Sequence, residues 1–86
     1  MLSSIHREEY QVFVQNLAKV REKKGLTQVV IAARISKTQS HVQKTLTAGR
    51  RMDCVESFQW MKALEMTPDE WMKLVELSVK QSGRKG

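Results

Sequence analysis

If residues 37–44 are helical, four polar side chains share one face of the helix: Gln39, Ser40, Gln43 and Lys44. With about 100° between successive residues, they fall within an arc of about 140° around the helix axis. Amide, hydroxyl and ammonium groups all donate hydrogen bonds, and no acidic residue stands between positions 37 and 44. The chemistry of this face is therefore hydrogen-bond donation to a partner that is rich in acceptors.

Base edges in the major groove of double-stranded DNA offer acceptors of this kind. A glutamine amide can pair with N6 and N7 of adenine, a lysine can donate to O6 and N7 of guanine, and a serine can bond to either base. A carboxylate on the same face would meet phosphates, so the lack of acidic residues agrees with a DNA partner. The alternative is a polar helix face that only water contacts.

The basic charge of the chain is concentrated around this face. The net charge is +6, and residues 19–51 carry nine basic side chains and one acidic one, whereas residues 52–82 carry three basic and six acidic ones. A basic region raises the local concentration of polyanions, and nucleic acid is the usual one. Charge alone, however, is equally well explained by solvated lysines.

Composition and motifs argue against an enzyme, a metal site or a membrane protein. The 86 residues suit one domain. The single cysteine, Cys54, has no disulfide partner and too few companions for zinc, so we expect a small buried residue in a reducing compartment. No catalytic constellation is recognisable, no apolar run approaches the ~18 residues of a membrane span, and the first ten residues do not resemble a secretory signal. We expect a cytoplasmic protein without catalytic activity or cofactor.

Apolar spacing and capping residues predict an all-α chain of about five helices. The first should span about 4–24, the second 28–35 and the third 38–47, and two more should begin after Asp53 and Thr67. The second helix is apolar on nearly every side, so we expect it to be mostly buried. The predicted inner face of the fourth helix consists of Val55, Phe58, Met61 and Leu64, with Trp60 off that face.

A short buried helix, a tight connection and a helix with a polar face together form a helix-turn-helix motif over about 28–47. In this motif the second helix lies in the major groove of DNA. Residues 17–71 resemble the Cro and lambda-repressor-like, or XRE-type, helix-turn-helix domain. The resemblance rests on GLTQ at 25–28, KTQSHVQK at 37–44, GRRMD at 49–53 and MTPDEW at 66–71.

The resemblance implies a compact five-helix, lambda-repressor-like domain over residues 1–82 and a disordered tail over 83–86. Its partner would be double-stranded DNA, and its function that of a sequence-specific transcriptional regulator, with repression as the expected role. The implied base readers are Gln39, Ser40, Gln43 and Lys44. The implied phosphate contacts are Thr27, Gln28, Lys37, Thr38, Arg50 and Arg51.

The chain departs from the family pattern in and around the third helix. Ser36 stands where a glycine with positive φ is usual, and the glycine that follows the third helix falls at Gly49 rather than at position 48. Thr45 replaces an apolar residue. These differences predict a third helix that ends, or is rotated, somewhat differently from the family pattern.

A DNA-binding protein of this family is expected to form a homodimer, because two recognition helices about one turn apart read a palindrome. The predicted dimer interface lies on the last helix and consists of Trp71, Met72, Val75 and Val79. The alternative function is a protein-interaction module or an antitoxin that binds a toxin, with Val29, Val30 and Leu46 facing the partner. The sequence does not choose between a phage repressor, a restriction-modification controller and an antitoxin.

Overall fold

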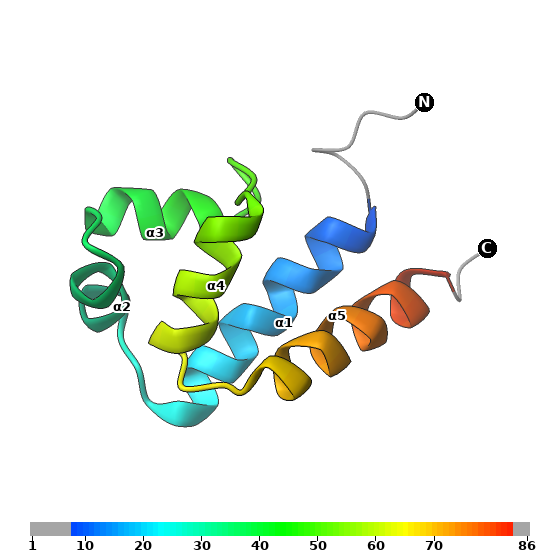
Figure 1. Cartoon of the computed structure of the whole chain (residues 1–86). Helices are drawn as coiled ribbons and strands as arrows, with labels where there is room; N and C mark the ends of the chain where they lie inside the picture. Colours follow the sequence, from blue (N-terminus) through cyan, green and yellow to red (C-terminus); the bar gives the residue numbers. More distant parts are fainter. Residues whose placement is uncertain (1–7, 84–86) are drawn as a thin grey trace.

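A computed structural model describes residues 8–83, which form five α-helices and no β-strand. The helices are α1 (Glu8–Lys24), α2 (Gln28–Ile35), α3 (Gln39–Leu46), α4 (Cys54–Ala63) and α5 (Pro68–Gly83). Figure 1 shows α2 and α3 together at one end of the molecule and α5 at the other. The prediction of an all-α, five-helix chain is confirmed. Residue 4, where the first helix was expected to begin, lies outside the described residues.

The longest helices, α1 and α5, pack side by side (Figure 1). The ring of Phe13 meets the indole of Trp71 edge to face at 5.4 Å between centroids. Farther along, Asn16 donates a hydrogen bond of 2.9 Å to the hydroxyl of Ser78, and both residues are buried. This helix pair forms one side of the molecule (Figure 1).

In the helix-turn-helix pair, α3 packs against α1 and α2 packs against α4. The helices α1 to α4 each contribute a fully buried apolar side chain to one core, and a fifth such residue directly follows α4: Leu17, Ile31, Val42, Trp60 and Leu64. Because this core lies behind α3, the opposite side of α3 is left to solvent.

Side-chain caps start the helices where the sequence predicted them. The hydroxyl oxygens of Thr27 and Thr38 accept from the backbone N–H three residues on, at 3.2 and 3.1 Å. Asp53 and Glu56 form a reciprocal capping box, and Thr67 forms another with Glu70. Caps are local interactions, each worth about 1 kcal/mol.

The two turns that flank α3 use residues other than glycine in the left-handed region. Ser36 has φ 58° at the end of α2, as the family pattern requires, and Ala48 has φ 61° after α3. Such a conformation costs an L-residue about 1 kcal/mol. Gly49, by contrast, does not have a positive φ. A glycine at position 49 therefore does not relieve the strain of the left-handed conformation at Ala48.

Four expectations about packing need correction. Although the second helix is apolar all round, only Ile31, Ala32 and Ile35 are buried, and Val29 is 59% exposed. On α4 the predicted inner residues Val55 and Phe58 are exposed, because the helix is rotated to insert Trp60 into the core beside Met61 and Leu64. Cys54, in the first turn of α4, is exposed rather than buried. Gly83 belongs to α5 rather than to a tail.

Candidate nucleic-acid interface

The exposed face of α3 carries all four predicted base readers. Gln39, Ser40, Gln43 and Lys44 are exposed, whereas Val42, Thr45 and Leu46 on the same helix are buried. The buried side holds the helix against the core, and the exposed side presents amide, hydroxyl and ammonium donors. Sequence spacing alone therefore brings these residues together as predicted.

The first residues of α2 lie beside this face. The side-chain amide of Gln28 donates a hydrogen bond of 2.7 Å to the amide oxygen of Gln43. Gln43 is thereby held in place, with its own N–H groups free to donate. The hydroxyls of Thr27 and Thr38 accept bonds from backbone N–H groups as caps, which leaves each O–H able to donate to an acceptor.

The predicted phosphate-binding cations fall into two groups. Lys37 and Arg51 are exposed, and neither makes a hydrogen bond or ion pair among residues 8–83 for which a partner is identified. Arg50 instead turns inward, where its guanidinium bonds to both carboxylate oxygens of Glu56 at 2.9 and 3.0 Å and to the hydroxyl of Thr45 at 3.2 Å. The structure thus separates two arginines that the sequence grouped together.

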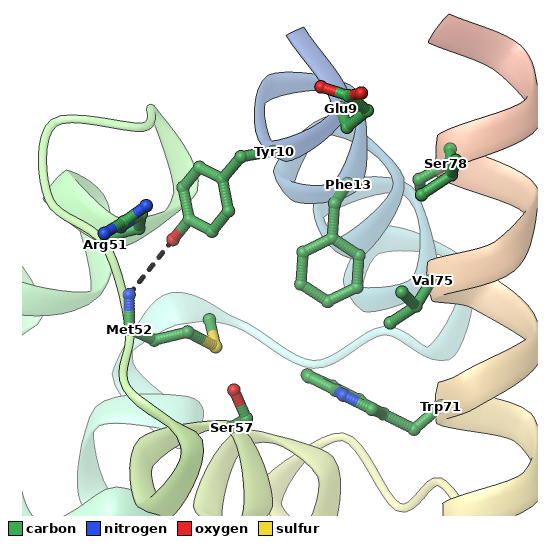
Figure 2. Close-up of a pocket in the computed structure, with 10 residues that line it drawn as sticks. Glu9, Tyr10, Phe13, Arg51, Met52, Ser57, Trp71, Val75 and Ser78 are labelled. Carbon is green, nitrogen blue, oxygen red and sulfur yellow. Dashed lines mark hydrogen bonds between the residues drawn. The ribbon is translucent and has the colours of Figure 1, made fainter. Parts of the chain in front are cut away.

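The loop that carries these arginines is attached to α1 by Tyr10. The Tyr10 hydroxyl donates to the carbonyl oxygen of Arg50 at 3.3 Å and accepts from the backbone N–H of Met52 at 3.2 Å (Figure 2). Burial raises the pKa of the Tyr10 hydroxyl above its usual value, so it stays protonated and able to donate. No local pattern predicts this contact, since the partners are 40 and 42 residues apart.

Two other basic side chains of the central region, although exposed, donate hydrogen bonds to carbonyl oxygens at a helix end. Lys24 donates to the carbonyl oxygens of Leu64 and Glu65 at 2.8 and 2.9 Å, and Arg34 donates to that of Ala63 at 2.8 Å. These cations satisfy carbonyls at the C-terminus of α4, where the helix dipole is negative.

Three of the four predicted interface residues of α5 line an apolar pocket between α1, α4 and α5. The pocket has a volume of about 420 Å³, with Trp71, Val75 and Val79 along its α5 side and Phe13 along its α1 side. Figure 2 shows Trp71 and Phe13 facing this space. Trp71 is 8% exposed, whereas Met72 and Val79 are about half exposed.

Metal-binding and membrane-spanning features are not found in the described part of the chain. Residues 8–83 contain no group of three or more His, Cys, Asp or Glu side chains that could hold a metal ion. None of the helices α1–α5 is long and apolar enough to cross a membrane.

One solved structure similar to this chain is the high-resolution crystal structure of the restriction-modification controller protein C.AhdI from Aeromonas hydrophila. The TM-score is 0.68 and the sequence identity 26%, over 76% of this chain and 98% of that chain. No protein-family model and no curated protein matches the sequence. The fold comparison confirms the resemblance read from the motifs: the chain has the Cro and lambda-repressor-like, or XRE-type, helix-turn-helix fold.

Proposed function

We propose that the protein is a sequence-specific regulator of transcription that reads the major groove of double-stranded DNA with α3. The observation that carries the proposal is the face of α3, where four exposed donors stand on a helix whose other side is fixed in the core. Rigid placement matters because base readout needs donors within hydrogen-bond distance of fixed acceptors. The proposal includes a cytoplasmic location, where the protein would meet its DNA.

In this proposal the side chains of the interface divide by task. Gln39, Ser40, Gln43 and Lys44 contact base edges, while phosphates are bound by Thr27, Gln28, Lys37, Thr38 and Arg51. The N-termini of α2 and α3 add unpaired N–H groups and a positive dipole end, which favour phosphate. Arg50, first expected among the phosphate contacts, is instead assigned to holding the loop, because its guanidinium is already bound by Glu56 and Thr45.

Repression is the proposed mode of regulation. A protein bound across the major groove excludes others from the same stretch of DNA, and this requires no activity beyond binding. The similarity to a restriction-modification controller favours a regulatory role of that general kind over the antitoxin role. It supplies no operator sequence.

The first test is a titration of random-sequence duplex DNA at about 50 and about 200 mM salt. The logarithm of the binding constant should fall with the logarithm of salt concentration by about 0.9 per phosphate contact. Absence of binding at the lower salt concentration would contradict the proposal. If binding is found, selection from a random library gives the preferred site.

A glutamine substitution then tests the reading of bases. Gln39→Ala should cost about 1–3 kcal/mol at one base position of the selected site and relax the preference there. Gln59→Ala, which removes an amide that is also exposed, from α4, is the control and should change neither affinity nor preference. Equal behaviour of the two variants would contradict the assignment of Gln39.

We also propose that two copies associate through the α5 face, so that two α3 helices read a palindrome. Support comes from the apolar pocket beside Val75 and from the exposed side chains of Met72 and Val79, with Trp71 forming the floor. Val79→Glu should shift the mass measured by sedimentation equilibrium from dimer to monomer. Val55→Glu, on the exposed side of α4, should not; dissociation by that variant instead would move the interface to α4.

The protein-interaction alternative retains one observation in its favour. Val29 is 59% exposed on α2, although Leu46, the third residue expected on that surface, is buried in the core. Co-purification of a second protein by a chain that fails to bind DNA would support this alternative, and Val29→Lys should then abolish the capture.

A further inference from the structure

The carboxylate of Glu56 connects three different segments of the molecule. Its Oε1 accepts hydrogen bonds from the backbone N–H of Asp53 at 3.2 Å and from the Arg50 guanidinium at 3.0 Å. Its Oε2 lies 3.1 Å from Nε2 of His41 and 2.9 Å from the Arg50 guanidinium. The Glu56 side chain is only 15% exposed, so these partners replace most of its contacts with water.

Two further hydrogen bonds close these contacts into a ring. The Arg50 guanidinium donates to the hydroxyl of Thr45 at 3.2 Å, and that hydroxyl donates to the backbone carbonyl of His41 at 3.0 Å. The polar ring, defined as His41, Thr45, Arg50 and Glu56, therefore includes two residues of α3, one of the loop and one of α4. Thr45, which stands where the family has an apolar residue, is fully buried and supplies the hydroxyl.

A second capping box in the same molecule shows that capping does not require such a ring. Glu70 accepts from the backbone N–H of Thr67 at 2.9 Å in the same way that Glu56 accepts from Asp53. Glu70 is exposed, and its identified hydrogen bonds within residues 8–83 go to Thr67. Three of the four bonds to the Glu56 carboxylate are thus additional to the cap.

The position of the ring relates it to the proposed DNA contacts. His41 lies on α3 between the exposed residues Ser40 and Gln43, and Arg50 immediately precedes Arg51. The main packing partners of α3 are α2 and α1, so the ring supplies a link from α3 to α4. It thereby controls how the base readers are placed relative to the phosphate-binding Arg51.

We infer that Glu56 is a positioning residue for the DNA-binding face: it fixes α3 relative to the loop that carries Arg51, and it contacts no DNA itself. The inference rests on the proposed function. The hydrogen bond from Arg50 keeps the pKa of Glu56 below its usual value, so the carboxylate is ionised at neutral pH and the ring is intact there. Specific binding needs base and phosphate contacts in register, whereas non-specific binding needs phosphate contacts alone. Loss of the ring should therefore reduce specific binding more than non-specific binding.

The test compares Glu56→Gln with the matched variant Glu70→Gln. In both variants glutamine retains one oxygen for the capping bond. Only Glu56→Gln also removes the negative charge that binds Arg50 and His41. Without DNA, two-dimensional ¹H–¹⁵N NMR spectra of Glu56→Gln should show altered amide shifts through α3 and the loop. Those of Glu70→Gln should change only around the start of α5.

With DNA, Glu56→Gln should lose about tenfold in affinity for the selected site and about twofold for random duplex, and Glu70→Gln should lose neither. The arginine partner provides a check against general destabilisation. The double variant Glu56→Gln, Arg50→Gln leaves no unpaired guanidinium. Its loss of affinity for the selected site should therefore be smaller than the sum of the losses of the two single variants. Additive losses would show that Glu56 and Arg50 act independently, and would contradict a ring that acts as a unit.

A milder variant keeps the inference testable if Glu56→Gln does not fold. Thr45→Val keeps the shape of the side chain and removes only the hydroxyl, so the core is preserved while two bonds of the ring are lost. It should reduce specific affinity by about threefold. Shift changes confined to the first turn of α4, with an unaltered ratio of specific to non-specific binding, would overturn the inference. Because the NMR comparison needs no DNA, its result distinguishes failure of the inference about the ring from failure of the proposed function.

Discussion

The basic side chains of the central region form two groups that the sequence does not distinguish. One group is bound within the protein: Arg21, Lys24, Arg34 and Arg50 donate to carbonyl oxygens, a hydroxyl or a carboxylate. The other group is exposed, without an identified partner among residues 8–83, and includes Lys37, Lys44 and Arg51. The two groups have the same chemistry and are interspersed along the chain, and yet only the exposed group can neutralise phosphates without first breaking an internal bond.

This difference shows that charge counted along the chain overestimates the charge available to DNA. The bound cations satisfy carbonyls at helix ends or pair with Glu56, so their charge contributes to the stability and shape of the fold. The exposed cations contribute little to stability, because an unpaired surface lysine gains nothing from folding. Substitutions in the two groups should therefore change different measured quantities.

The largest expected effect follows from removing two exposed cations together. Lys37→Gln combined with Arg51→Gln should weaken binding to random duplex by about 30-fold, or about 2 kcal/mol, because two phosphate contacts are lost. The slope of log K against log salt should become shallower by about 1.8. Thermal unfolding should be almost unchanged. A slope equal to that of the parent would show that these side chains are solvated rather than bound to phosphate.

A bound cation should give the opposite result. Arg34→Gln removes the donor to the carbonyl of Ala63 and the ion pair with Glu65. The expected loss is about 1 kcal/mol of unfolding free energy, reduced from the value of a buried charged bond because the Arg34 side chain is 39% exposed. The salt dependence of DNA binding should be unaltered. Chemical denaturation measures the unfolding free energy. A shallower slope of log K against log salt would instead show that Arg34 belongs to the exposed, phosphate-binding group.

The features that the sequence predicted correctly depend on neighbouring residues. The caps at Thr27, Thr38, Asp53 and Thr67 each bond to the N–H group three residues away, so their types and spacing are sufficient evidence. The exposed face of α3 follows in the same way from helical periodicity, because Val42 and Leu46 mark its buried side.

The features that the sequence missed depend on contacts between distant segments. The rotation of α4, which buries Trp60 and exposes Phe58, is set by packing against α2, and either face of α4 has enough apolar residues to be the inner one. The inward position of Arg50 depends on Glu56 and on Tyr10, which is 40 residues away. No local pattern separates Arg50 from Arg51, so both were predicted to contact phosphate.

The smallest expected effect concerns the two turns that separate exposed from bound cations. Ser36 stands between Arg34 and Lys37, and Ala48 between Lys44 and Arg50, and both have positive φ. In each case a residue in the left-handed region lies between a cation with a hydrogen bond within the protein and an exposed cation without an identified partner among residues 8–83. Ser36→Gly and Ala48→Gly should relieve strain of about 1 kcal/mol each, offset in part by the greater freedom of glycine in the unfolded chain.

The net gain in unfolding free energy from each glycine should therefore be about 0.5 kcal/mol, measured by chemical denaturation. DNA affinity should not change, because the direction of the chain is retained. Ala33→Gly, placed within α2 where φ is helical, is the control and should instead lose about 1 kcal/mol. A Ser36→Gly variant that is more stable but binds DNA more weakly would contradict this expectation. It would show that the serine side chain itself contacts DNA, in addition to the role of its backbone conformation.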